Sequence, residues 1–197
     1  MRLERCRGLL NNLKSGAEGR ILFYSNEKTF TVEPYVNRQN DRWVRLGGPE
    51  AAANAGDQAE NRYVTTTKHP ATAMLLGVVA STGEVGPPIW YPQGYRLCAD
   101  AYIDALRTKI LPWMRQVAAN HGRGGQPAPF TYQQDSAPAH KARKTIEFLL
   151  SEKNDFWGPD MWPPNSPDLA PLDYGVWPYI ALKACKTRAD SVPVLKR

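Results

Sequence analysis

Two aspartates in this chain occupy positions from which they could act together. Asp135 follows a strand-like run in QQDSAPAH, and Asp173 opens a helical pattern in SPDLAPLDYGVW. The 37 residues between them are enough for one helix, one strand and a loop, so the chain can leave one edge of a sheet and return to it. Carboxylates that converge at such an edge make an oxygen-rich site for Mg²⁺, and two ions about 3.5–4 Å apart can activate a water and stabilise the leaving oxygen of a phosphodiester. The pattern favours metal-dependent phosphodiester chemistry.

Most isolated aspartates at such positions have a simpler role. An aspartate before a helix is usually an N-cap, and one after a strand is usually a turn residue. Asp168, in SPDL, fits that role. The segments around Asp135 and Asp173 are longer and more distinctive, which favours the metal-site hypothesis for these two.

Hydrophobic periodicity predicts the helices that position the aspartates. The apolar spacing is typical of amphipathic helices in four segments. These are residues 1–19, 99–119, 140–153 and a last helix ending at about residue 188. Pro112 lies inside the second pattern and is expected to kink or divide that helix.

Runs of β-formers predict the strands. Residues 21–33 are interpreted as two strands joined by a tight turn at Glu27-Lys28, and the polar segment 47–62 as a surface loop. Further strands are predicted at 72–80, through Ile89-Trp90, at 129–135 and within DFWGPDMWPP. Strands followed by alternating helices and strands predict an α/β fold, a mixed sheet flanked by helices.

Composition and charge narrow the classes of protein. The 197 residues are 42% hydrophobic and 22% charged, and no apolar run approaches the roughly 20 residues that a membrane span needs. The net charge of +6 suits a polyanionic partner, although it is weak support alone. Three cysteines with no CxxC pair argue against a disulfide framework or a zinc site and fit a reducing compartment.

Three stretches together resemble the catalytic motifs of the mariner-superfamily transposases, which cut and paste DNA. They are ILFYSNEKTFTVEPYVNRQNDRW, QQDSAPAH and PPNSPDLAPLDYGVW, and they occur in the family's order between about residues 5 and 190. The resemblance implies a ribonuclease H-like fold in which three acids hold Mg²⁺ or Mn²⁺. The 37-residue spacing with Asp at its end resembles one mariner-related branch.

Carried over residue by residue, the resemblance makes Asp135 the second acid and Asp173 the third. The first acid falls at position 26, where the family has Ser-Asp-Glu-Lys and this chain has Ser25-Asn26-Glu27-Lys28. Asparagine offers one neutral carbonyl oxygen, whereas a ligand that bridges two metals needs two anionic oxygens. We therefore expect weakened metal binding at Asn26, Asp135 and Asp173 and impaired cleavage. Glu27 is not expected to substitute, because neighbours on a strand point to opposite faces.

Basic residues beside this site are candidates for binding double-stranded DNA. Lys141, Arg143 and Lys144 are predicted on the solvent face of a helix, where they suit phosphate contacts, although such a run is often only a solvated face. His140 could contact DNA phosphate or the outer shell of a metal. A structural hydrogen-bonding role is the preferred interpretation of a lone histidine at a helix start.

The resemblance divides the chain into a short N-terminal helix and linker, residues 1–20, and a ribonuclease H-like catalytic domain, residues 21–190. Full transposases of this family carry helix-turn-helix modules that bind the transposon ends, and the residues before the first strand are too few for one such module. The expected protein is thus a truncated transposase core, nuclear, with DNA as its partner, a homodimer as one expected assembly and no membrane association.

Three functions stay open at this point. The first is a transposase core that is impaired in cleavage. The second is a non-catalytic, transposase-derived module for DNA binding or dimerisation, and the third is an active metal nuclease that tolerates Asn26. Strand nicking compared with an Asn26→Asp variant separates the first from the third, and salt-dependent duplex binding without cleavage favours the second.

Overall fold

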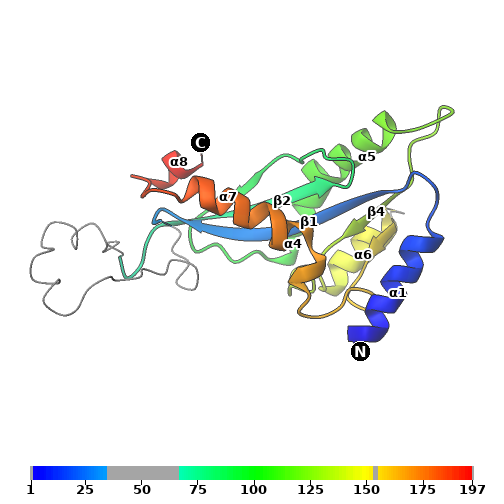
Figure 1. Cartoon of the computed structure of the whole chain (residues 1–197), viewed down its shortest axis with the longest axis horizontal. Coiled ribbons are helices and arrows are strands. Elements are labelled where there is room, and N and C mark those ends of the chain that lie inside the picture. The colour runs from blue at the N-terminus through cyan, green and yellow to red at the C-terminus, as the bar shows by residue number, and fades with distance from the viewer. Residues whose placement is uncertain (1, 35–66, 153–154, 197) are drawn as a thin grey trace, which may run out of the picture.

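Five strands form one mixed sheet in the computed structural model, which describes residues 2–34, 67–152 and 155–196. The strand order is β3-β2-β1-β4-β5 (Figure 1). Strands β1, β2 and β3 pair antiparallel, and β4 and β5 run parallel to β1. The strands are β1 (Ile21–Thr31), β2 (Thr72–Ala80), β3 (Ile89–Tyr91), β4 (Phe130–Gln133) and β5 (Asp155–Trp157). The predicted α/β class with a mixed sheet is confirmed, while the loop predicted at 47–62 lies outside the described residues.

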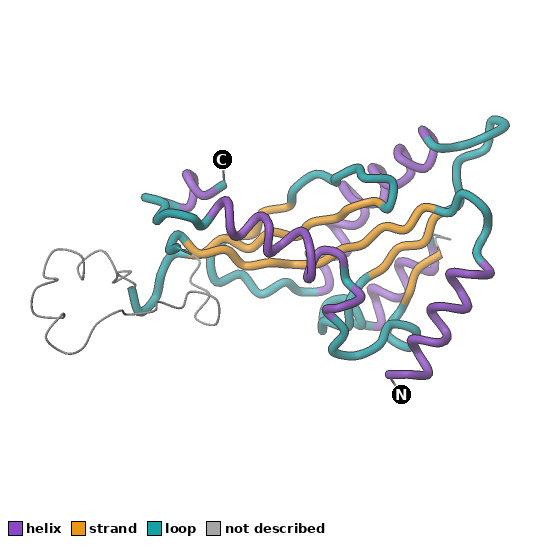
Figure 2. The backbone as a smooth tube through the Cα atoms, viewed as in Figure 1, coloured by secondary structure: helices purple, strands orange, loops and turns teal. Residues whose placement is uncertain are grey.

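Helices pack on both faces of the sheet (Figure 2). The α-helices are α1 (Arg2–Ser15), α4 (Ala99–Ala105), α5 (Leu111–Asn120), α6 (Arg143–Ser151), α7 (Trp177–Ala184) and α8 (Val192–Leu195). Within the described residues, two π-helical turns, η2 (Leu106–Ile110) and η4 (Leu172–Val176), and the 3₁₀ turn η3 (Pro167–Leu169) accompany them. The helix predicted over 99–119 is present and is divided as expected: η2 widens the backbone just before Pro112, which has no N–H to donate. None of the described helices is long and apolar enough to cross a membrane.

The turn predicted at Glu27-Lys28 is wrong. Strand β1 runs through these residues without a break, and its pairing with β2 extends from Phe23 opposite Ala80 to Thr31 opposite Thr72. The error has a physical cause, because polar side chains can project from a strand whose backbone is fully paired with a partner far away in sequence. Asn26 therefore lies inside a long strand and not at its end.

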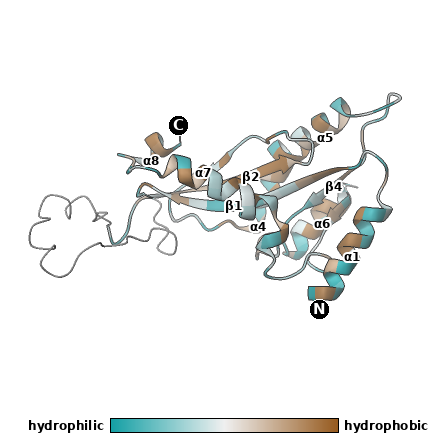
Figure 3. Ribbon diagram, in the orientation of Figure 1, coloured by the Kyte–Doolittle hydropathy of each residue, from teal (hydrophilic) through white to brown (hydrophobic). Residues whose placement is uncertain are grey.

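The two faces of β1 enter different cores. Phe23 packs with α4, η2 and α5 in the larger core, whereas Phe30 packs with η4 and α7 on the opposite face. Hydrophobic residues run along β2 and the first part of β1, the middle of β1 is hydrophilic, and α1 shows alternating hydrophobic and hydrophilic bands (Figure 3). Because side chains alternate along a strand, Asn26 shares the α7 face with Phe30, and Glu27 shares the α4 face with Phe23. One strand thus sends two adjacent polar side chains to opposite sides of the sheet.

Candidate functional site

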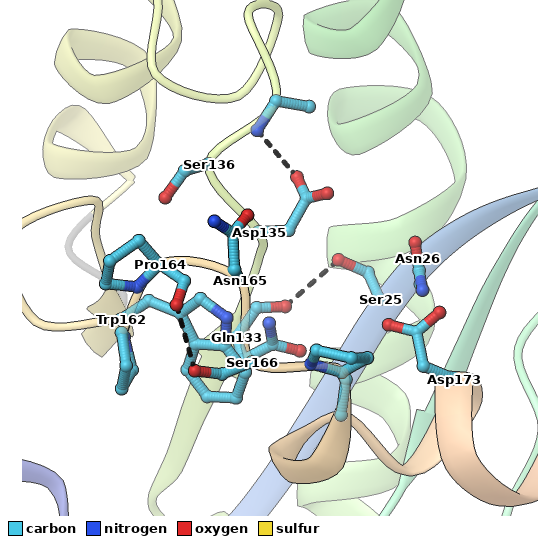
Figure 4. Close-up of a pocket in the computed structure, with 14 residues that line it drawn as sticks. Ser25, Asn26, Gln133, Asp135, Ser136, Trp162, Pro164, Asn165, Ser166 and Asp173 are labelled. Carbon is cyan, nitrogen blue, oxygen red and sulfur yellow. Dashed lines mark hydrogen bonds between the residues drawn. The ribbon is translucent and has the colours of Figure 1, made fainter. Parts of the chain in front are cut away.

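Asn26, Asp135 and Asp173 line one pocket with a volume of about 340 Å³ (Figure 4). The structure brings these three positions together from β1, from the segment after β4 and from η4. A second wall comes from the loop between Trp162 and Pro167. The pocket opens beside the point where the parallel strands β1 and β4 part, which is where ligands commonly bind in sheets with parallel strands.

The pairing of β1 with β4 brings Asn26 level with Asp135. The last parallel pair is Tyr24 with Gln133, and each of the two polar residues lies two positions beyond it. The junction is held by buried hydrogen bonds: Ser25 Oγ donates to the Gln133 carbonyl at 3.0 Å, and Tyr132 Oη donates to Ser25 Oγ at 2.8 Å. This parallel register determines the spacing of the first two site positions.

Packing of α7 on the sheet brings in Asp173. Gly77 of β2 is paired with Asn26, and a Cβ atom at Gly77 would lie 2.6 Å from Cη2 of Trp177. The absence of a side chain at Gly77 lets the Trp177 ring lie against β2. Asp173 lies one turn before Trp177, so its carboxylate faces the Asn26 amide (Figure 4).

The surroundings of Asp173 disfavour its charged form. Burial raises the pKa of this carboxyl, and the negative charge of Asp135 raises it further. A hydrogen bond from the Asn26 amide and the charge of Lys28 oppose the rise, but the net pKa stays above its ordinary value. Two neighbouring carboxylates that repel each other in this way are the electrostatic condition that a bound cation relieves.

Asp135 is held ionised by hydrogen bonds on one of its oxygens. Burial alone would raise its pKa, but the hydrogen bond and charge of His140, together with the Ala137 N–H, lower the pKa below its ordinary value. Oδ1 accepts from Ala137 N at 2.8 Å and from His140 Nδ1 at 2.5 Å. No hydrogen bond to Oδ2 occurs within the described ranges, so this oxygen is left to face a cation.

His140 is completely buried between two carboxylates. Its side chain is 0% exposed, and Nε2 lies 2.9 Å from Oε1 of Glu27. Burial lowers the pKa of the imidazole, but hydrogen bonds and charge interactions with Asp135 and Glu27 outweigh it and raise the pKa to about 9. The imidazole is therefore protonated at neutral pH and donates from both nitrogens. A direct contact with DNA phosphate is ruled out by this burial, and the hydrogen-bonding role is the one that the structure displays.

Glu27 does not line the pocket. It lies on the α4 face of β1 and contacts His140, as the alternation along the strand predicts. One ligand atom each from Glu27, Asp135 and His140 lie within 4.8 Å of one another, a spacing that would suit a metal ion. In this structure each imidazole nitrogen lies at hydrogen-bonding distance from one carboxylate, which accounts for the close spacing of the cluster.

Gln133 is a pocket residue that sequence reasoning missed. It is 1% exposed, and neither atom of its amide has a hydrogen-bond partner in the described part of the chain. The strand alternation of FTYQ could have placed its side chain opposite to Tyr132, but nothing in the sequence marks it as unpartnered. A buried amide without partners is uncommon in folded proteins.

The predicted DNA-binding cations lie outside the pocket. Lys144 Nζ is 2.5 Å from Oδ1 of Asp100, and Arg143 Nε is 3.4 Å from Oε1 of Glu147. Lys141 is exposed. Their contact with DNA remains a prediction, with two of the three charges already paired to acids.

The donor set fits Mg²⁺ or Mn²⁺ in part. Oδ2 of Asp135, the carboxylate of Asp173 and the amide oxygen of Asn26 are hard oxygen donors on one pocket that would hold such an ion. One or two carboxylates are the usual protein contribution to a Mg²⁺ site, and substrate phosphate and water supply the rest. These donors suit one ion better than two, because Asn26 is a neutral amide and a ligand that bridges two ions needs two anionic oxygens.

The antiparallel–parallel sheet in the order 3-2-1-4-5, with polar side chains at the junction of β1 and β4, defines a ribonuclease H-like fold. Among solved structures, the fold is similar to that of the catalytic domain of Mos1 mariner transposase.

Three structures illustrate the likeness. The chain matches the Mos1 mariner paired-end complex with Mn at TM-score 0.72 and 21% identity, covering 99% of this chain and 51% of that one. It matches the Mos1 paired-end complex with left transposon end at TM-score 0.70 and 20% identity, covering 99% of this chain and 51% of that one. It matches the Mos1 catalytic domain with Raltegravir and Mg at TM-score 0.66 and 20% identity, covering 99% of this chain and 76% of that one.

These likenesses establish the fold. The chain spans about half the length of the transposase in the paired-end complexes. No family model matches the sequence, and no curated protein matches it.

Proposed function

We propose that this chain is a mariner-type transposase catalytic core whose DNA cleavage is impaired by Asn26. The observation that carries the proposal is the meeting of Asn26, Asp135 and Asp173 in one pocket of a Mos1-like fold. These positions come from three distant segments and coincide with the three acids that the motifs imply. A chance arrangement of turn aspartates gives no reason for that coincidence.

Each polar residue of the pocket has its own role in holding a substrate phosphodiester. Asp135, ionised and fixed through Oδ1, presents Oδ2, and Asp173 presents a carboxylate with a raised pKa. A bound Mg²⁺ or Mn²⁺ supplies Lewis-acid activation of the attacking and leaving oxygens. The Asn26 amide faces Asp173 and opposes the rise of its pKa, but it adds no negative charge. The pocket thus keeps the geometry of a three-acid site with two of its three charges.

DNA is the proposed partner. The pocket lies on a chain of net charge +6, and the Mos1 structures with the same fold include complexes with transposon ends. We include Lys141, Arg143 and Lys144 as candidate phosphate contacts. The proposed localisation is nuclear, and the proposed assembly is a homodimer. Residues 21–190 form the proposed catalytic domain.

A second candidate function is a non-catalytic, transposase-derived module that binds DNA or dimerises. The neutral amide of Asn26 favours it, because its interaction with Asp173 opposes the raised pKa of this acid without a metal. The two candidates differ in one result: only an impaired enzyme recovers cleavage when the acid is restored.

Nicking of supercoiled plasmid in Mn²⁺ or Mg²⁺ tests the proposal with three proteins. The unchanged chain should nick at background rate, Asn26→Asp should nick measurably, and Asn26→Asp with Asp135→Asn should return to background. If the unchanged chain and Asn26→Asp nick at the same rate above background, the chain is an active nuclease. No nicking by Asn26→Asp, together with salt-dependent duplex binding, would support the second candidate.

A further inference from the structure

We propose that His140 is a positioning residue that fixes the Asp135 carboxylate toward the pocket, and that Glu27 orients His140 from the other side. The inference rests on the proposed function, since it takes Asp135 as a metal ligand. It assigns a role to the buried His140 and the partly exposed Glu27, which both lie outside the pocket itself.

Asp135 needs such support because of its place in the chain. Strand β4 ends at Gln133 and α6 begins at Arg143, so no sheet or helix pairing holds the carboxylate. A short turn brings the histidine back, with His140 N donating to the Ala137 carbonyl at 3.0 Å. The imidazole then reaches Asp135 Oδ1 at 2.5 Å. The contact fixes one oxygen and leaves Oδ2 directed elsewhere.

His140 is itself clamped on three sides. Its ring packs against Tyr102 with a centroid separation of 4.1 Å, and Nε2 donates to Glu27 at 2.9 Å. Its carbonyl accepts from Gln134 Nε2 at 3.2 Å, and Gln134 accepts from Tyr102 Oη at 3.1 Å. With the side chain 0% exposed, the imidazole has no room to adopt another orientation.

Strand β1 is therefore connected to the site twice. Asn26 points into the pocket, and the adjacent Glu27 points to the opposite face and acts on Asp135 through His140. Partners that orient a metal ligand in this way typically change metal affinity by about 10–100-fold when removed. This predicts that loss of the histidine contact weakens metal binding even where the fold is kept.

Two amide substitutions separate positioning from simple core packing. In His140→Asn the side-chain nitrogen lies near the place of Nδ1 and can still donate to Asp135. In His140→Gln the nitrogen lies near the place of Nε2 and can donate only to Glu27. Both remove the ring from Tyr102, so both should lose similar stability.

The experiment measures Mn²⁺ affinity by calorimetry and the melting temperature of each variant in the Asn26→Asp background. Leu150→Ala, an exposed position of α6 outside the pocket, is the matched control. We expect His140→Gln to weaken Mn²⁺ binding about 10–100-fold, and His140→Asn and the control to stay within about threefold. Equal weakening by both amides, or by neither, would overturn the positioning role.

Two further measurements keep the test decisive. The carboxyl ¹³C NMR signal of Asp135 in metal-free protein should shift more in His140→Gln than in His140→Asn; equal shifts in both contradict the proposal. This readout holds even if Asn26→Asp binds no Mn²⁺, a result that would count against the proposed function alone. If the histidine variants do not fold, Glu27→Leu should shift the signal and Glu27→Gln, which keeps an acceptor, should not.

Discussion

Gly77 of β2 and Trp177 of α7 pack so closely that no side chain fits between them. A Cβ atom at Gly77 would lie 2.6 Å from the Trp177 ring, and Gly77 is the β2 partner of Asn26. The contact therefore joins the helix that follows Asp173 to the strand position opposite Asn26. The site depends on this one small residue for the approach of its third member.

Gly77→Ala should lower the free energy of unfolding by about 1–3 kcal/mol, since overpacking a filled core forces neighbours to shift. Urea unfolding measures it. Gly175→Ala is the control: it lies in η4 near Asp173, nothing lies within 4 Å of its Cβ position, and its stability should stay unchanged or rise. A Gly77→Ala protein as stable as the parent would show that the Trp177 ring does not depend on this gap.

Adjacent glutamines should respond in opposite directions. Gln133→Met removes a buried amide that has no partner in the described residues, so unfolding free energy should rise by about 1 kcal/mol. Gln134→Met removes an amide that forms hydrogen bonds with Tyr102 and His140, so the unfolding free energy of this variant should fall by about 1–3 kcal/mol. Thermal or urea unfolding of both decides the matter, and destabilisation by Gln133→Met would mean that its amide has a partner or ligand.

The metal-free chain should lose stability as pH rises from about 6.5 to about 9. The folded state holds the His140 proton with a pKa near 9, whereas the unfolded imidazole releases it near 6.5, so this stabilisation is complete below 6.5 and lost above 9. The loss should be on the order of 2–3 kcal/mol. Unfolding curves of the parent and His140→Gln at several pH values test it, and parallel pH profiles of the two would contradict it.

The sequence was sufficient for the class of fold and for the convergence of Asp135 and Asp173. The strand before Asp135 and the helix that follows Asp173 contain apolar runs that local pattern can predict, and the resemblance to the mariner motifs supplied the pairing of the two acids. Local pattern failed at Glu27-Lys28, where turn-forming polar residues lie within a strand held by pairing with β2. That pairing spans dozens of residues and leaves no mark on neighbouring positions.

The hydrogen bonds of His140 were equally out of reach. His140 and Glu27 are 113 residues apart, and neither position shows an unusual neighbourhood in the sequence. Strand alternation predicted that Glu27 faces away from Asn26, but only the packing of the segment after β4 shows what it meets there. Buried polar contacts between distant segments are decided by tertiary structure.

Asn26→Asp should be less stable than the parent in EDTA. The new carboxylate replaces an amide that lowers the pKa of Asp173 with a like charge, next to an acid whose pKa is already raised. We expect a loss of about 1–2 kcal/mol in unfolding free energy, with Mn²⁺ restoring most of it. Asn165→Asp, in the loop that forms the second wall of the same pocket, is the control for added charge. Stability in EDTA that equals the parent's would show that residue 26 and Asp173 are not coupled.

Calorimetric titration of Mn²⁺ into the parent chain, Asn26→Asp and Asn26→Asp with Asp173→Asn addresses the shared site most directly. If side chains 26, 135 and 173 hold one cation, Asn26→Asp should bind Mn²⁺ at least about tenfold more tightly than the parent, and the added Asp173→Asn should abolish that gain. Identical Mn²⁺ affinity in all three proteins would contradict a common site at these positions.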